Sequence, residues 1–157
     1  MKNSFKKYNS AFTLVELLVV IAFIGIMTSV ALVSFQSSKD KKIVETEARK
    51  VAATIREAQN YALTGKGISV SCGTINFCYN NSAQYSINGG REAASCTVEY
   101  YKLGNGANFT NTACFTFSAP WGNVSASANI GVKRGSYCST ITVTSSGNVT
   151  EGSAVGC

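Results

Sequence analysis

The feature that most constrains this 157-residue chain is a nearly unbroken apolar run between Ala11 and Phe35. It carries one charge, Glu16, near its start, and no charged residue follows Glu16 until Lys39. The 24 residues from Phe12 to Phe35 would form a helix about 36 Å long at ~1.5 Å per residue. That length crosses the ~30 Å hydrocarbon core of a bilayer. The run therefore predicts a membrane helix, with a leader before it and a domain after it.

Glu16 needs a physical explanation in such a run. A carboxylate at the centre of a membrane helix costs roughly 2.5 to 3.5 kcal/mol, and less near an end. The charge still requires a cationic partner, and the run contains none. The segment SAFTLVELLVVIAFIGI, which follows a short lysine-containing leader, resembles the class III prepilin signal that type IV pilins share with type II secretion pseudopilins.

The resemblance implies how the start of the chain is processed. In that family a prepilin peptidase cuts just before a Phe, which places the cut between Ala11 and Phe12 and makes Phe12 the N-methylated mature terminus. Glu16 is then the carboxylate that pairs with the terminal amine of a neighbouring subunit. Thr13 belongs to the same F-T-L-x-E assembly motif. The chain departs from the family in having Ala11 where Gly is usual, and in lacking a Pro within the apolar helix.

The leader indicates the topology. It carries Lys2, Lys6 and Lys7 and no acidic residue, so the positive-inside rule keeps it in the cytoplasm. The expected protein is a single-pass protein of the cytoplasmic (inner) membrane with its head outside, which later enters an extracellular pilus or a periplasmic pseudopilus. An ordinary secretory signal is the competing interpretation. It fits less well because the apolar run exceeds the roughly 7 to 15 residues of its apolar region.

Beyond the apolar run, the helix is expected to continue as an amphipathic segment. Apolar residues recur there at spacings of three and four, which places them on one helical stripe. The stripe consists of Val44, Ala48, Val51, Ile55, Ala58 and Ala62. Glu47 and Lys50, three positions apart, are expected to pair on the outer face. Gly65 is a suitable C-terminal cap.

From Gly67 onward the apolar period switches to two, with Gly, Asn, Ser and Thr between the apolar segments. The predicted fold class is therefore α+β and pilin-like: a long N-terminal helix packed on a C-terminal antiparallel sheet. Predicted strands are 68–72, 75–79, 84–87, 97–103, 114–117, 129–132 and 141–144, with another at Val149 and turns at 88–90, 104–106 and 145–147. The predicted segments are the leader 1–11, the transmembrane and filament-core helix 12–38, its amphipathic continuation 39–65, and the β-rich head 66–157.

All six cysteines follow the apolar run: Cys72, Cys78, Cys96, Cys114, Cys138 and Cys157. An even number on one side of a membrane anchor indicates disulfides in an oxidising compartment. A metal site is the weaker alternative, because the chain has no His and no C-x-x-C pair. Six cysteines allow fifteen pairings. Nearest-neighbour pairing would join Cys72 to Cys78, Cys96 to Cys114, and Cys138 to Cys157.

The C-terminal third carries a second, looser resemblance, to the group of H-type pseudopilins and fimbrial T-type minor pilins. In that group an F-x-P-x-G turn is followed by a strand and then by I-x-V-S-x-x-G-R-V. The matching positions are Phe117, Pro120, Gly122, Ile141, Val143, Ser146, Gly147 and Val149. Asn148 stands where many members have Arg. For Pro120, Gly122 and Gly147, a role in turns and packing is favoured over a role in binding.

The net charge of +6 suggests a nucleic-acid ligand until it is divided along the chain. Without the three leader lysines, eleven basic and eight acidic residues leave +3. From Gly67 onward, four basic and three acidic residues leave +1, and Lys133 with Arg134 is the one adjacent basic pair. These two residues are the candidate nucleic-acid contact, but DNA is not expected as a partner.

The residues do not indicate an enzyme. With no His and a single Asp, Asp40, the head offers no recognisable base to activate its hydroxyl groups. No cofactor or metal is expected. The favoured function is a structural subunit: a pilin, minor pilin or pseudopilin. Its partners would be other pilin-like subunits, the prepilin peptidase, the inner-membrane assembly machinery and the cytoplasmic membrane. The alternative is a receptor at the filament tip that binds DNA or a surface.

Overall fold

The computed structural model describes residues 12–66, 74–89 and 97–157, without the side chains of residues 30–34 and 97–98. One helix, α1, runs from Leu14 to Thr64. The chain forms two compact units, Met1–Ser37 and Ser38–Cys157. The first unit contains the start of α1, and the second contains the rest of α1 with all the strands.

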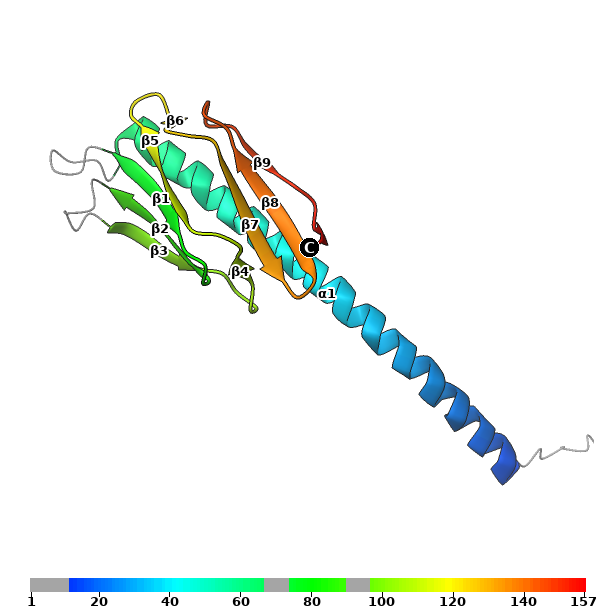
Figure 1. The fold of residues 1–157 in the computed structure, drawn as a ribbon. Helices are drawn as coiled ribbons and strands as arrows, with labels where there is room; N and C mark the ends of the chain where they lie inside the picture. The colour runs from blue at the N-terminus through cyan, green and yellow to red at the C-terminus, as the bar shows by residue number, and fades with distance from the viewer. Residues whose placement is uncertain (1–11, 67–73, 90–96) are drawn as a thin grey trace, which may run out of the picture. The chain divides into compact units, whose positions relative to one another are not determined.

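The first sheet of the second unit has five strands in the order β3-β2-β1-β5-β6 (Figure 1). Its strands are β1 (Ile75–Tyr79), β2 (Gln84–Gly89), β3 (Thr97–Lys102), β5 (Ala113–Ser118) and β6 (Asn123–Val124). β1 lies in the middle and pairs antiparallel with both β2 and β5. Two strands far apart in the sequence, β1 and β5, are therefore neighbours.

The second sheet also has five strands. They are β4 (Asn108–Phe109), β7 (Ala128–Arg134), β8 (Tyr137–Val143), β9 (Val149–Glu151) and β10 (Val155–Gly156). The order is β10-β8-β7-β4, and β9 also pairs with β8. The long β7–β8 hairpin pairs from Ala128 with Val143 to Arg134 with Tyr137. Both sheets pack along the C-terminal half of α1 (Figure 1).

The core is built on the predicted helix stripe. All six residues of that stripe are at most 1% exposed. Ala52 and Tyr61 are buried as well, because two sheets enclose a wider part of the helix surface than one would. Opposite the helix, Phe77 stacks on Phe115 with ring centroids 5.4 Å apart. Burying an aromatic or branched side chain of this size stabilises the fold by roughly 1.5 to 3 kcal/mol.

The α+β, pilin-like class is confirmed, with three corrections. The head has two sheets where one was predicted, and the short strands β4, β6 and β10 were not anticipated. Asn88 and Gly89, predicted as part of a turn, end β2 because they pair with Asn76 and Ile75. The predicted strand 68–72 lies outside the described residues.

Glu47 corrects the prediction for the helix surface. It pairs with Lys50 at 2.8 Å as predicted, but its side chain is 1% exposed and does not lie on an outer face. The loop after β3 covers it, and the Gly104 backbone N–H donates to Glu47 Oε2 at 3.0 Å. A buried carboxylate needs such charge-assisted partners, since an unpaired one would lose its hydration without compensation.

Candidate processing and assembly site

The predicted assembly residues lie at the start of α1. Thr13 directly precedes the helix, and its Oγ1 accepts a hydrogen bond from the backbone N–H of Glu16 at 3.2 Å. A threonine three residues before a glutamate is the spacing of a capping box, which satisfies N–H groups that have no partner within the helix. Thr13 therefore caps the start of α1, a role that was not predicted from the sequence. The spacing of Thr13 and Glu16 could have indicated it, because it matches the capping-box pattern.

The Glu16 carboxylate lies in the first turn of α1 and is exposed. Negative charge is favourable there because the helix dipole places partial positive charge at the amino end. Within the described residues, 12–66, 74–89 and 97–157, Glu16 takes part in no ion pair. Phe12, the first residue of the F-T-L-x-E motif, is 75% exposed, and Ala11 lies outside the described residues.

Apolar side chains are exposed all around the start of α1. The large ones are Phe12, Leu14, Val15, Leu17, Leu18, Val19, Val20, Ile21, Phe23, Ile24, Ile26, Met27 and Phe35. Extensive apolar exposure of this kind marks a surface that is covered in the working state of a protein. Among the residues that the structure describes, no helix combines the length and the apolar content needed to span a membrane.

Among the residues that the structure describes, the head contains two disulfides. Cys138 bonds Cys157, as predicted, but Cys78 bonds Cys114, so the predicted pairs of Cys78 with Cys72 and of Cys114 with Cys96 are wrong. The reason is the strand order, because β1 and β5 are adjacent and Cys78 lies opposite Cys114 in their register. Their Cα atoms are 4.1 Å apart. Cys72 and Cys96 lie outside the described residues.

The candidate nucleic-acid pair is only partly accessible. Lys133 is exposed, but the Arg134 Nε donates to Asp40 Oδ1 at 2.8 Å, and the two side chains are 23% and 18% exposed. This ion pair holds the end of β7 against α1. Arg134 is therefore committed to a structural contact, and the pair does not form an open basic surface.

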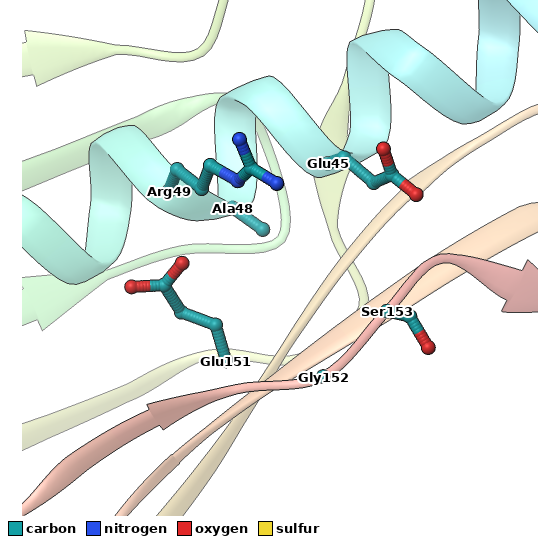
Figure 2. A pocket seen from close by; sticks show the side chains of 6 residues that line it. All are labelled: Glu45, Ala48, Arg49, Glu151, Gly152 and Ser153. Atoms are coloured by element: carbon teal, nitrogen blue, oxygen red, sulfur yellow. The ribbon is translucent and has the colours of Figure 1, made fainter.

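A groove of about 230 Å³ lies between α1 and the segment after β9 (Figure 2). It is lined by Glu45, Ala48, Arg49, Glu151, Gly152 and Ser153. The Glu151 carboxylate points toward the helix in Figure 2 and accepts from Arg56 at 2.9 Å, whereas Ser153 points away. The Ser153 hydroxyl makes no hydrogen bond to a base among the described residues.

A cluster of two tyrosines and two glutamates, the Tyr61 cluster, joins the end of α1 to β3. The hydroxyls of Tyr61 and Tyr101 bridge the carboxylates of Glu57 and Glu99, with Tyr61 donating to Glu57 at 2.7 Å and Tyr101 to Glu57 at 3.2 Å. Lys66 donates to the Tyr61 hydroxyl at 2.9 Å. Burial, followed by the hydrogen bond to Glu99, raises the pKa of Tyr101, and the hydrogen bond to Glu57 raises the pKa of Tyr61. Both phenols stay protonated and act as donors that fix the helix end.

Metal binding finds no support in the geometry of this part of the chain. Within the described ranges, no group of three or more His, Cys, Asp or Glu side chains converges on one point. The acidic residues of the Tyr61 cluster are already bridged by phenol hydroxyls.

Comparison with known families finds one match. Residues 6–32 match the prokaryotic N-terminal methylation motif, which includes Phe12, Thr13 and Glu16. Neither the curated proteins nor the solved structures contain a match to the chain. The motif surrounds the capped start of α1, and α1 packs on an antiparallel head as in pilins. The chain therefore carries the class III prepilin signal of the type IV pilin and pseudopilin family.

Proposed function

We propose that this protein is a structural subunit of a type IV pilus or a type II secretion filament. The observation that carries the proposal is the methylation motif at residues 6–32, with its Thr13 and Glu16 at the first turn of a helix that ends in a β-rich head. In this proposal a prepilin peptidase removes residues 1–11 and Phe12 becomes the methylated terminus. Residues 12–38 anchor the subunit in the inner membrane before assembly, which the sequence alone supports through its long apolar run.

Assembly follows from the chemistry of the first turn. The Glu16 carboxylate is exposed, and the described residues supply no cation for it. In an apolar filament core an unpaired carboxylate has a high free-energy cost. An ion pair between Glu16 and the terminal amine of a neighbouring subunit would therefore be strongly favoured. The exposed apolar side chains around the helix would then be buried against those of neighbouring subunits.

Within the family, we propose a minor subunit of the H-type pseudopilin and fimbrial T-type group. The support is the C-terminal resemblance, whose Gly122 and Gly147 adopt positive φ angles of 66° and 84°. The Gln59 Nε2 donates to the Gly122 carbonyl at 3.2 Å, and a Cβ on Gly147 would lie 2.6 Å from that same oxygen. Both glycines therefore lie in turns that approach each other beside the last turns of α1.

The proposal is tested by measuring the mature terminus. Intact-mass analysis of the protein extracted from membranes should show loss of Met1 to Ala11 and one added methyl group. The same protein produced without the prepilin peptidase is the control and should keep its leader. A full-length mass in the presence of an active peptidase would contradict the proposal.

A further inference from the structure

The outer face of the first sheet carries a groove that the proposed filament role does not use. It has a volume of about 280 Å³ and crosses β3, β2, β1 and β5. The described residues that line it include Asn80, Gln84, Ser86, Tyr100, Thr112 and the Cys78–Cys114 disulfide. Because strand side chains alternate, these residues face away from the core that Phe77 and Phe115 fill.

The strand register explains how the groove is built. Tyr100 lies opposite Ser86, Ser86 opposite Cys78, and Cys78 opposite Cys114, so one row crosses four strands. The disulfide and Ser86, which is 8% exposed, form a floor that the paired strands hold in position. Tyr100 rises at one side of this row with 78% of its surface exposed. The groove therefore combines a rigid floor with an accessible aromatic ring.

The polar groups around the groove are uncharged. Asn80, Gln84 and Thr112 supply amide and hydroxyl groups, and none of the described lining residues carries a charge. The Asn80 Oδ1 already accepts from Ser82, and the Thr112 hydroxyl donates to Asn81 Oδ1 at 2.9 Å, so the Asn80 amide N–H groups and the Thr112 oxygen lone pairs are the groups left for a ligand. The Gln84 side-chain amide makes no hydrogen bond to any residue that the structure describes, so its donor and acceptor are open to a ligand. Lys102 lies opposite Gln84 in the register, but it is not part of the lining.

We propose that this groove binds an uncharged carbohydrate. A pyranose ring presents one face of C–H groups, which packs on an aromatic ring such as Tyr100, and an edge of hydroxyls, which pairs with amides and hydroxyls. An apolar surface with a few placed polar groups is the usual composition of a small-ligand site. The volume is near the low end of the ~300 to 1,000 Å³ range for such sites, which suits a short saccharide segment. The inference concerns the head alone and does not depend on filament assembly.

Saturation-transfer NMR tests the site on the full mature chain in a sugar-free zwitterionic detergent, because alkyl glycoside detergents would compete. The probes are cellohexaose, chitohexaose and maltohexaose, with an oligogalacturonate as the charged comparison. At least one neutral hexasaccharide should receive saturation at its ring protons. Tyr100→Ala should weaken its binding about tenfold or more, whereas Tyr100→Phe should keep most of it because the ring remains.

Matched variants separate this groove from other surfaces. Trp121→Ala removes the other highly exposed aromatic ring of the described head, and Lys102→Ala removes the cation opposite Gln84 in the strand register; both variants should bind as the unchanged protein does. Gln84→Ala should weaken binding several-fold and provides a second test if Tyr100→Ala does not fold. Far-UV circular dichroism and mapping of the Cys78–Cys114 bridge check folding. The proposal fails if no neutral probe binds, if binding survives both Tyr100→Ala and Gln84→Ala, if oligogalacturonate alone binds, or if Trp121→Ala or Lys102→Ala abolishes it.

Discussion

The Arg134 guanidinium donates through Nε to Asp40 at 2.8 Å, although the two residues are 94 positions apart in the sequence. The contact joins the end of β7 to the part of α1 that enters the head. Both side chains are less than a quarter exposed, so the arginine is neutralised by a close partner. Arg134, a candidate nucleic-acid contact by sequence, thus makes a structural ion pair within the head.

This ion pair leads to a prediction about DNA. Affinity for duplex DNA depends on the number of phosphates that basic side chains neutralise. Because Arg134 is paired, the mature chain in detergent should bind a duplex no more tightly than the non-specific range of roughly 10⁻⁴ to 10⁻⁶ M at physiological salt. An anisotropy titration measures this. Sub-micromolar binding that disappears on replacing Lys133 and Arg134 with Ala would contradict the prediction and favour the receptor alternative.

Glu16→Leu should affect assembly without affecting the head. The variant removes the only carboxylate of the apolar run, while the core of the head lies in a separate unit. We expect normal insertion and cleavage but strongly reduced incorporation into filaments. Immunoblots of sheared filaments and of membranes measure the two fractions. Glu45→Gln, on the same helix but outside the motif, is the control and should assemble normally; equal incorporation of both variants would show that the Glu16 charge is incidental.

Non-reducing peptide mapping should find the pairs Cys78–Cys114 and Cys138–Cys157. These bridges span 36 and 19 residues, for which chain entropy gives stabilisations of ~4 and ~3 kcal/mol. Replacing Cys78 and Cys114 together with Ser should therefore lower the melting temperature more than replacing Cys138 and Cys157. A peptide that links Cys78 to Cys72 would contradict the strand order of the first sheet.

Gly147→Ala should destabilise the head by about 1 to 3 kcal/mol. Gly147 has a φ of 84°, and a Cβ there would lie 2.6 Å from the Gly122 carbonyl oxygen, so strain and a close contact add together. Gly106→Ala is the matched control, since its φ is 73° but a Cβ would meet nothing within 4 Å. Thermal unfolding followed by circular dichroism compares the two. An equal loss in both variants would mean that backbone conformation alone accounts for the effect.

Local patterns predicted the local structure of this protein well. The helix stripe from Val44 to Ala62 is buried as its spacing predicted. Such a stripe can be identified from the sequence because residues three and four positions apart lie on the same face of a helix. The strands at Ile75–Tyr79 and Ala113–Ser118 were also anticipated approximately. The prepilin signal was identifiable because its residues are contiguous, and the family comparison matches the same segment.

Non-local features could not be predicted in the same way. The pairing of Cys78 with Cys114 depends on which strands become neighbours, and spacing in the sequence carries no such information. The same holds for the groove beside Tyr100, whose residues come from four strands. The burial of Glu47 was missed because a charged residue beside a lysine is usually exposed, and only the loop at Gly104 reverses this.

Glu47 also gives α1 a fixed position along the sheets. Much of the buried helix stripe is alanine, and a row of small, similar side chains could slide by one turn, about 5.4 Å, and still find apolar neighbours. The Glu47 carboxylate could not, because it would move away from the Gly104 N–H while remaining surrounded by protein. Together with the Arg134–Asp40 and Arg56–Glu151 ion pairs, this buried acid favours one alignment of helix and head over others that hydrophobic packing would accept.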